Sequence, residues 1–319
     1  MQFKYRQAVA EIVHGKLGPI NNLLADSSII EIMYNPDGKL WVEQFKVGMR
    51  ELDINYGQDN AILLMRTIAS YNNTSTGPEA LPLKGSLPGG ERFQGYMPPI
   101  VDAPSFTIRC NRSCNITLED YVPHCMSEKT KEKLCTALRE RKNIIVSGST
   151  GSGKTTLTSA LLRQLNTIAP NLRIITMEDT SEIQVLHKNK VQLKATDEIK
   201  YTELLKAALR SRPDRIILGE VRAEEAFDLL KCWNTGHSGG ISTIHSNSAA
   251  SALTRFESLI LETQTNLTVP AVRSNIVEAV NLIVHIERGC GSTPVITELI
   301  KVNGLNSDAT YNTENIIEK

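Results

Sequence analysis

A glycine-rich stretch at residues 148–155 has the composition needed to hold phosphate groups. Glycines let several backbone N–H groups approach a phosphate without a Cβ in the way, a lysine ammonium bridges the β- and γ-phosphates, and a hydroxyl binds Mg²⁺. The stretch matches G-x-x-x-x-G-K-[ST] in full and consists of Gly148, Ser149, Thr150, Gly151, Ser152, Gly153, Lys154 and Thr155, with Thr156 directly after it. It therefore predicts a site for a nucleoside triphosphate and Mg²⁺, in which Lys154 neutralises phosphate charge and Thr155 binds the metal.

The context of this stretch supports that interpretation and favours ATP as the nucleotide. The stretch follows an apolar strand, NIIVS, and precedes a helix expected over 154–168. This context separates a phosphate loop from a glycine-rich turn that matches by chance. A GTPase would add a base-reading N-K-x-D motif, whereas residues 189–192 read NKVQ, with Gln where Asp is needed. We therefore expect ATP rather than GTP.

Acidic side chains end two apolar strands downstream of the loop. Glu178 and Asp179 follow LRIITM, and Glu220 follows RIILG. The carboxyl ends of parallel strands form the binding edge of a sheet, where carboxylates can hold Mg²⁺ and orient water. We expect Glu178 and Glu220 to act there as catalytic groups and, with Thr155, as metal ligands. The alternative is that each acid only stabilises the N-terminus of a following helix. The residue before Glu220 is Gly219, so the usual Asp-Glu pair is incomplete.

A histidine stands at the end of a third strand. The segment GHSGGISTIH, residues 236–245, is a glycine-rich turn that leads into a short apolar strand and ends in His245. An imidazole at this place can hydrogen-bond a γ-phosphate or pass its presence on to a neighbouring group. The alternative is that His245 is purely structural. The presence of the other motifs in the same chain favours the functional interpretation.

These residues need a sheet of parallel strands to bring them together. From Ser127 onward, predicted helices and strands alternate, which is typical of a parallel sheet wound with helices. The chain before it reads as strand-rich, with a hairpin signal at residues 35–38. We therefore expect an α/β protein with three parts: an N-terminal α+β domain at 1–112, an interdomain linker at 113–126, and the domain with the phosphate loop at 127–319.

Composition narrows the classes of function. The 319 residues contain 35 Lys and Arg against 35 Asp and Glu, and zero net charge argues against a general nucleic-acid coat. The six cysteines form no C-x-x-C pair, so neither a zinc ribbon nor a disulfide framework is indicated. The N-terminal residues carry charges where a signal peptide needs an apolar core, and no long apolar run follows. We expect a cytosolic protein with at most peripheral membrane contact.

Four motifs occur in a fixed order: GSTGSGKT, ITMEDTSEI, RPDRIILGEVR and TGHSGGISTIHSNSA. Together they resemble the secretion ATPases that power type II and type IV secretion, pilus motors and conjugation. The details most resemble the conjugative-transfer branch, the TrbB type. The resemblance covers residues 92–288, and the last motif is the most specific to this superfamily.

This resemblance implies a fold and roles for individual residues. Members have a RecA-like ATPase domain, preceded by a smaller N-terminal domain that helps close the nucleotide site, and they assemble as hexameric rings. By the resemblance, Glu178 belongs to the acidic box, Glu220 to the second nucleotide motif, where Gly-Glu is normal, and His245 to the histidine box. Three arginines match those that approach the phosphates from the N-terminal domain: Arg92, Arg109 and Arg112.

The position of Arg109 gives a separate reason to expect that it contacts a phosphate. It ends the apolar strand SFTI, and the sequence shows no acidic cluster of the same domain beside it. A γ-phosphate brought near by domain closure would supply the missing partner. The alternative for Arg109 and Arg112 is a surface cation.

The sequence thus predicts an ATP-hydrolysing hexameric motor of a type IV secretion or conjugative transfer system, which drives pilus assembly or substrate transfer through domain motions. Its expected partners are inner-membrane secretion-channel proteins and coupling ATPases, at a cytoplasmic position peripheral to the inner membrane. We expect no direct sequence-specific binding of nucleic acid. The alternatives are a nucleotide-gated assembly scaffold with negligible turnover and a pilus motor ATPase. A nucleic-acid translocase is disfavoured by the neutral charge and by an aromatic content of only 5%.

Overall fold

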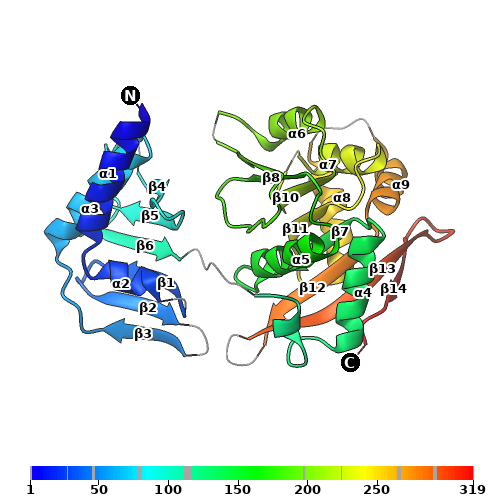
Figure 1. Cartoon of the computed structure of the whole chain (residues 1–319), viewed down its shortest axis with the longest axis horizontal. Coiled ribbons are helices and arrows are strands. Elements are labelled where there is room, and N and C mark those ends of the chain that lie inside the picture. Colours follow the sequence, from blue (N-terminus) through cyan, green and yellow to red (C-terminus); the bar gives the residue numbers. More distant parts are fainter. Residues whose placement is uncertain are drawn as a thin grey trace. The chain divides into compact units, whose positions relative to one another are not determined.

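The chain divides into two compact units, Met1–Cys114 and Asn115–Lys319 (Figure 1). Each unit has its own sheet and its own hydrophobic core, so each is described by itself. The computed structural model describes residues 2–26, 28–44, 47–77, 81–110, 116–196, 198–223, 225–263, 267–289 and 293–318.

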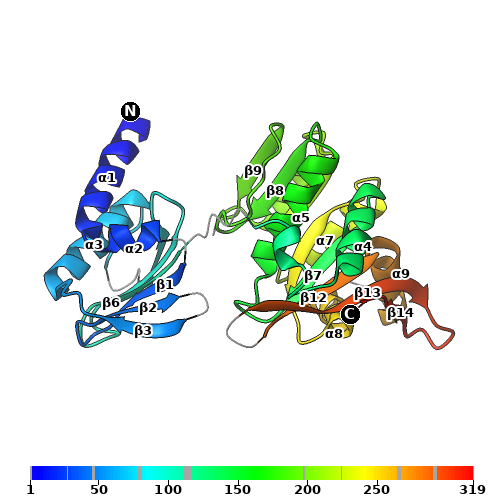
Figure 2. The ribbon, with the colours of Figure 1, turned by 60° about the horizontal axis from the view of Figure 1, so that its bottom comes forward.

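The first unit is a six-stranded antiparallel sheet with helices on one face (Figure 2). The strand order is β3-β2-β1-β6-β5-β4. Its elements are α1 (Gln2–Leu17), α2 (Ile20–Ala25), β1 (Ile29–Tyr34), β2 (Leu40–Gln44), β3 (Gly48–Leu52), α3 (Gln58–Tyr71), β4 (Leu83–Ser86), β5 (Arg92–Tyr96) and β6 (Ser105–Arg109).

Alternating side chains explain why this sheet has one covered face. In β6, Phe106 and Ile108 are buried, whereas Thr107 and Arg109 are half-buried. This alternation is what a strand with a single covered face requires. Phe106 stacks on Tyr34 of β1 in the core, with ring centroids 5.3 Å apart. The face away from the helices therefore carries the polar half of each strand, and Arg109 belongs to it.

The second unit is built on an eight-stranded sheet with the order β14-β13-β12-β7-β11-β10-β8-β9. The six strands from β12 to β9 pair in parallel, which confirms the predicted parallel sheet. β13 and β14 extend it as antiparallel strands. The strands are β7 (Ile144–Gly148), β8 (Ile174–Glu178), β9 (Lys190–Lys194), β10 (Arg215–Val221), β11 (Ile241–His245), β12 (Leu282–Arg288), β13 (Pro294–Leu305) and β14 (Tyr311–Asn315).

Helices cover both faces of this sheet (Figures 1 and 2). α4 and α5 pack on one face and α6 to α9 on the other, and each face has its own apolar core. None of the helices within the described ranges is long and apolar enough to cross a membrane. The helices are α4 (Glu128–Arg139), α5 (Lys154–Ile168), α6 (Tyr201–Leu209), α7 (Glu225–Asn234), α8 (Ala249–Leu261) and α9 (Val269–Ala279).

The stretch expected as a linker, 113–126, differs from that expectation in its second part. Leu118, Tyr121, Cys125 and Met126 are buried in the core that α4 and α5 share with the sheet. Their spacing of i, i+3, i+7 and i+8 fits a helix face, but Pro123 interrupts the segment and only Glu119–Tyr121 form a short helical turn. Residues 116–126 therefore pack with the second unit, while 113–115 lie outside the described residues.

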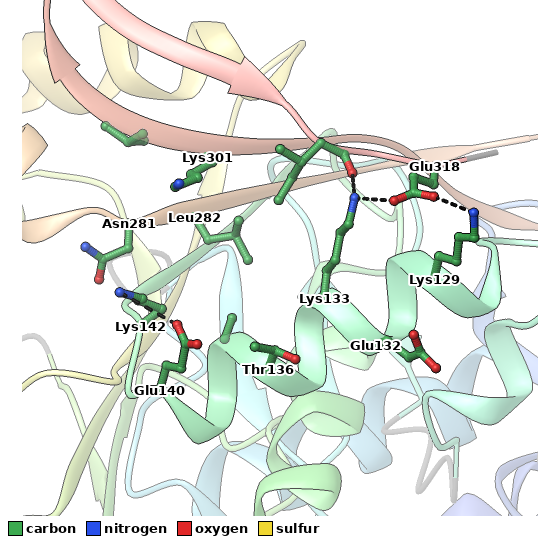
Figure 3. A pocket seen from close by; sticks show the side chains of 13 residues that line it. Lys129, Glu132, Lys133, Thr136, Glu140, Lys142, Asn281, Leu282, Lys301 and Glu318 are labelled. Atoms are coloured by element: carbon green, nitrogen blue, oxygen red, sulfur yellow. Dashed lines mark hydrogen bonds and ion pairs between the residues drawn. The ribbon is translucent and has the colours of Figure 1, made fainter.

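The C-terminal residues fasten α4 to the sheet (Figure 3). Lys133 of α4 donates a hydrogen bond to the Ile316 carbonyl over 2.7 Å. The Glu318 carboxylate lies 2.7 Å from the Lys133 ammonium and 3.0 Å from that of Lys129. Its backbone carbonyl accepts hydrogen bonds from Ser127, the N-cap of α4, and from Thr130. This strap closes one end of a groove of about 560 Å³ between α4 and the strands.

Candidate functional site

The phosphate loop predicted from the sequence connects β7 to α5. Gly151 and Gly153 have φ values of +69° and +100°, which a residue with a Cβ adopts only under strain. Gly148 is needed for space, because a Cβ there would lie 2.3 Å from the carbonyl oxygen of Ile286. The loop leads directly into the N-terminus of α5, whose first backbone N–H groups have no partner within the helix. The glycines thus shape a backbone cradle at a positive helix end.

Lys154 is buried at the base of this loop, with an exposed fraction of 7%. Its ammonium donates to the carbonyl oxygens of Gly148 at 2.9 Å and Ser149 at 2.8 Å. It also lies 3.2 Å from Nδ1 of His245. Ser152 Oγ is buried without a hydrogen bond to any described residue, a polar group left over inside the loop. The site therefore places the Lys154 ammonium group against the loop backbone and leaves a buried hydroxyl beside it.

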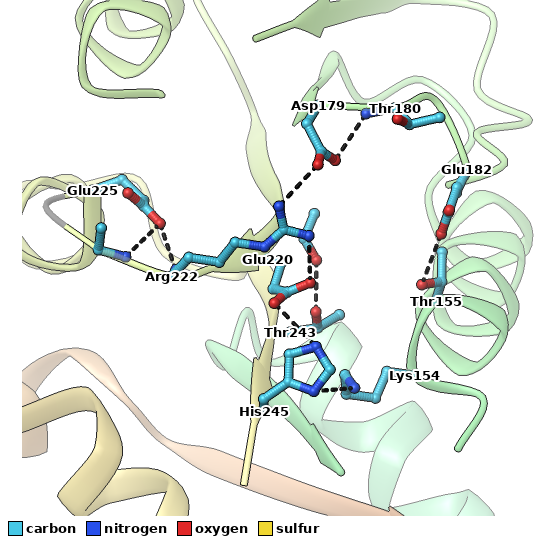
Figure 4. A network of polar contacts seen from close by, with 12 residues as sticks. Lys154, Thr155, Asp179, Thr180, Glu182, Glu220, Arg222, Glu225, Thr243 and His245 are labelled. Carbon is cyan, nitrogen blue, oxygen red and sulfur yellow. Dashed lines mark hydrogen bonds and ion pairs between the residues drawn. The ribbon is translucent and has the colours of Figure 1, made fainter. Parts of the chain in front are cut away.

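His245 connects the loop to the strand-end carboxylate Glu220. It ends β11, and its Nε2 lies 3.1 Å from Glu220 Oε1 (Figure 4). An ammonium group can only donate, so Nδ1 accepts from Lys154 and the ring proton sits on Nε2, facing Glu220. Burial, and next the positive charge of Lys154, lower the pKa of His245, which favours this neutral ring. The structure thus brings Lys154, His245 and Glu220, three of the residues singled out in the sequence, into one chain of contacts.

The chain of contacts continues from Glu220 to the end of β8. Arg222 lies 3.0 Å from Glu220 Oε2 through one guanidinium nitrogen and 2.8 Å from Asp179 Oδ2 through the other (Figure 4). Its hydrogen bond to Glu220 is the main cause that raises the Arg222 pKa. Arg222 was missed at the sequence level; it follows directly after the end of β10, two residues beyond Glu220.

Glu178 has a different environment from Glu220. Its side chain is 5% exposed, and Oε1 accepts the backbone N–H groups of Glu182 at 3.0 Å and Ile183 at 2.9 Å. Burial raises the pKa of Glu178 to about 7. A Cβ at Gly219 would lie 2.9 Å from Glu178 Cγ, so the Asp of the usual Asp-Glu pair has no room before Glu220.

Glu182, which the sequence did not single out, approaches the predicted metal ligand Thr155. Thr155 Oγ1 donates to Glu182 Oε2 over 3.4 Å. Glu178 reaches this place only indirectly, because its carboxylate holds the backbone of residues 182 and 183. The acidic side chain that the structure brings to Thr155 is thus four residues beyond the predicted one. The turn that makes this possible carries no motif.

The predicted N-terminal arginines belong to the first unit. Arg92 and Arg109 lie directly opposite each other on β5 and β6. Glu31 of β1 lies opposite Arg109 on the other side, and Glu43 of β2 lies opposite Glu31. The expectation that this domain has no acidic cluster beside Arg109 is therefore wrong, because the sheet register brings the distant Glu31 and Glu43 to its side. Arg112 lies outside the described residues.

The sheet, the loop and the strand-end residues define this protein as a phosphate-loop protein of the α/β class. Comparison with known families narrows the class. The family model of the type II/IV secretion system proteins matches residues 88–310, and the chain belongs to this family. The match confirms the resemblance drawn from the four motifs.

Relatives place the chain in the conjugative-transfer branch. It is 43% identical to the conjugal transfer protein TrbB of Rhizobium radiobacter, over 91% of this chain and 88% of the relative. It is 31% identical to the type IV secretion system protein VirB11 of Bartonella quintana, over 89% of this chain and 92% of the relative.

Solved structures confirm the fold class. The VirB11 ATPase from the Brucella suis type IV secretion system, in complex with sulphate, is similar with a TM-score of 0.51 and 28% identity, over 93% of this chain and 96% of that one. The pilus retraction motor PilT with bound ADP is similar with a TM-score of 0.64 over 94% of this chain and 82% of that one. At 19% identity, PilT supports the fold alone.

Proposed function

We propose that this protein binds and hydrolyses ATP as a hexameric motor of a type IV secretion or conjugative transfer system. The observation that carries the proposal is the chain of contacts from Lys154 through His245 to Glu220. It joins the group that would neutralise phosphate charge to the carboxylate that would orient a water molecule. A loop that only bound nucleotide would not need this connection.

In the proposed reaction, water attacks the γ-phosphate in line with the bond to the leaving ADP. The loop N–H groups and the α5 N-terminus bind the phosphates, and Lys154 offsets the charge that develops on them. Glu220 accepts a hydrogen bond from the attacking water, while Arg222 and His245 hold its carboxylate in place. To reach the phosphates, Lys154 must leave its contacts with the loop carbonyls. Nδ1 of His245 then loses the ammonium group from which it accepts a hydrogen bond.

The oxygen ligands of this site suit Mg²⁺. Mg²⁺ prefers one or two protein oxygens together with waters and substrate phosphates, rather than a cage made of side chains. Thr155 and Glu182 already lie within hydrogen-bonding distance, and the described residues hold no cluster of three or more metal-binding side chains. We propose that Thr155, with Glu182 and Glu220 at the carboxyl edge, holds the ion, and that Glu178 supports Glu182 from behind. Bound Mg²⁺ would supply positive charge at the β- and γ-phosphates.

The assembly and partners in this proposal come from the relatives. Two of the relatives are a protein of conjugal transfer and a protein of type IV secretion, and the similar PilT structure is that of a pilus retraction motor with bound ADP. On that basis we propose a hexameric ring, with ATP as the nucleotide, placed on the cytoplasmic side of an inner-membrane channel. Arg92, Arg109 and Arg112 would approach the phosphates from the first unit.

Phosphate release from ATP by the purified full-length chain tests the proposal. We expect turnover that requires Mg²⁺, that is faster with ATP than with GTP, and that comes with a hexamer in analytical ultracentrifugation. ATP binding without turnover would instead support the assembly scaffold. Failure to bind ATP or ADP at millimolar concentration would overturn the proposal.

A further inference from the structure

A second polar chain lies beneath the phosphate loop, outside the residues assigned so far. Ser147, the last β7 residue before Gly148, has its Oγ 2.7 Å from Nδ1 of His285. Nε2 of His285 lies 3.2 Å from Glu287 Oε1. The parallel pairing of β12 with β7 places His285 directly beside Ser147. Two consecutive polar contacts thus join a serine, a histidine and a carboxylate.

This order of groups is also found in nucleophilic hydrolases, but burial excludes that chemistry here. Ser147 is 0% exposed and His285 is 1% exposed, so a substrate cannot reach the hydroxyl. Only the outer end, Glu287, is half-exposed. A neutral ring whose Nε2–H donates to Glu287 leaves Nδ1 to accept the Ser147 hydroxyl. The chain therefore fixes one rotamer of Ser147, at the root of the loop.

The same strand touches the loop at two further points. The carbonyl oxygen of Ile286 fills the space where Gly148 would carry a Cβ. Arg288 donates from Nε to the carbonyl oxygen of Gly151 over 2.7 Å, at the crest of the loop. Residues 285–288 of β12 thus hold the root of the loop through His285 and its crest through Arg288. A loop rich in glycine has many conformations to lose, so external contacts of this kind decide which one is populated.

We propose that His285 is a positioning residue of the phosphate loop, acting through Ser147 and anchored by Glu287. It holds the loop in the conformation that receives the phosphates, so that ligand binding does not have to order it. The inference rests on the proposed function for its consequence in turnover, but its claim about the loop itself is independent of nucleotide.

The test compares His285→Leu, which removes both hydrogen bonds, with His285→Asn, whose amide oxygen can still accept the Ser147 hydroxyl. Ser147→Ala removes the other partner. His187→Leu is the matched control, since His187 is equally buried but lies between β8 and β9, away from the loop. The measurements are hydrogen exchange of peptides covering residues 145–155 without nucleotide, the Kd of fluorescent ADP, and kcat and KM for ATP.

We expect His285→Leu and Ser147→Ala to speed exchange in the loop and to raise the Kd of ADP about tenfold, with most of the affinity regained in His285→Asn. KM should rise more than kcat falls, because the variants keep Lys154 and Thr155, the loop side chains that act on the phosphates. His187→Leu should leave loop exchange unchanged. Unaltered loop exchange in folded His285→Leu and Ser147→Ala would overturn the inference, even if the wild type proved to bind no nucleotide. So would a loss of affinity in His285→Asn as large as in His285→Leu.

Discussion

The ammonium group of Lys154 lies 3.2 Å from Nδ1 of His245, and Nε2 of that ring lies 3.1 Å from Glu220. The His245 ring is the middle group of this chain. If Lys154 moves toward a phosphate, Nδ1 of His245 loses its hydrogen-bond donor. His245 is then free to rotate or to take up a proton, and either change alters its hydrogen bond to Glu220. The relationship gives a physical route by which phosphate binding at the loop reaches the strand-end carboxylate.

Replacing Lys154 by alanine tests the loop assignment most directly. We expect Lys154→Ala to lower kcat for ATP by at least about a hundredfold, because the cation that offsets phosphate charge is lost while the loop backbone remains. Steady-state phosphate release with the oligomer checked by ultracentrifugation is the measurement. Lys206→Ala on α6, an exposed lysine, is the matched control and should behave as the wild type. Wild-type turnover in folded Lys154→Ala would remove the assignment.

Glu220→Gln should separate binding from hydrolysis. The amide keeps the shape of the side chain and one hydrogen bond, but it cannot accept from water as a carboxylate does or pair with Arg222. We expect kcat to fall about a hundredfold or more, with the Kd of ADP within a few fold of the wild type. Glu203→Gln, on the exposed part of α6, serves as the control. Normal hydrolysis by Glu220→Gln would show that the strand-end carboxylate is structural.

Glu178 should make the folded protein less stable as the pH rises. Its pKa is about 7 in the folded chain against an ordinary 4.5, so between these values the folded state holds the proton more tightly. Stability is therefore full below pH 4.5, falls as the pH rises, and levels off above about 7, with a total loss of up to about 3 kcal/mol. Glu178→Gln resembles the protonated acid and should lack this loss.

Urea unfolding of wild type and Glu178→Gln without ligand, at pH 5, 6, 7 and 8, measures this difference. The free energy of unfolding of Glu178→Gln, minus that of the wild type, should increase with each step up to pH 7 and then stay constant. Glu182→Gln is the control, since the Glu182 carboxyl group belongs to the same turn but is only half-buried. A stability difference that does not change with pH would contradict the raised pKa.

Arg222 should support hydrolysis by holding two carboxylates, those of Glu220 and Asp179. A lysine can face Glu220 or Asp179, but it lacks the planar fork that reaches both at once. We expect Arg222→Ala to lower kcat about tenfold to a hundredfold and Arg222→Lys to recover only part of it, with ADP binding little changed. Arg255→Ala is the control, because Arg255 of α8 is an equally exposed arginine whose acidic partner, Glu262, caps the end of the helix. Equal activity of Arg222→Ala and wild type would show that Glu220 needs no second support.

Much of the second unit was predictable because its signals are local. The loop, the strand ends at Glu220 and His245, and the alternation of strands and helices are each written within a few residues of sequence. The family resemblance followed from the same short motifs. Apolar runs of five residues, flanked by glycine or by charge, are enough to place parallel strands.

What was missed depends on contacts between distant parts of the chain. Glu182 reaches Thr155 only because the buried Glu178 carboxylate holds the intervening turn, and no pattern encodes that turn. Arg288 reaches the loop because β12 pairs with β7, which lies more than a hundred residues earlier. The partner of Arg109 was missed for the same reason, since strand register sets it.

That partner decides how Arg109 must be tested. Arg109 ends β6, and Glu31 stands opposite it on β1, so two roles are open to the guanidinium. As a sensor of phosphate it should respond to nucleotide from the first unit, whereas as part of a cross-strand pair it only supports the sheet. Glu31→Gln distinguishes the two roles, because it removes the acidic neighbour and leaves the arginine in place.

For the sensing role we expect Arg109→Ala to lower kcat for ATP about tenfold or more and Arg109→Lys to lower it less, because lysine keeps the charge without the bidentate fork. ADP affinity should hardly change, and Glu31→Gln should keep turnover within about twofold, since a cross-strand pair of this kind contributes little. Steady-state turnover, ADP affinity and urea unfolding of the three variants are the measurements. If Glu31→Gln and Arg109→Ala lose stability and turnover together, Arg109 supports the sheet. If turnover is unchanged in Arg109→Ala and in the double variant that also replaces Arg112, neither arginine senses the phosphate.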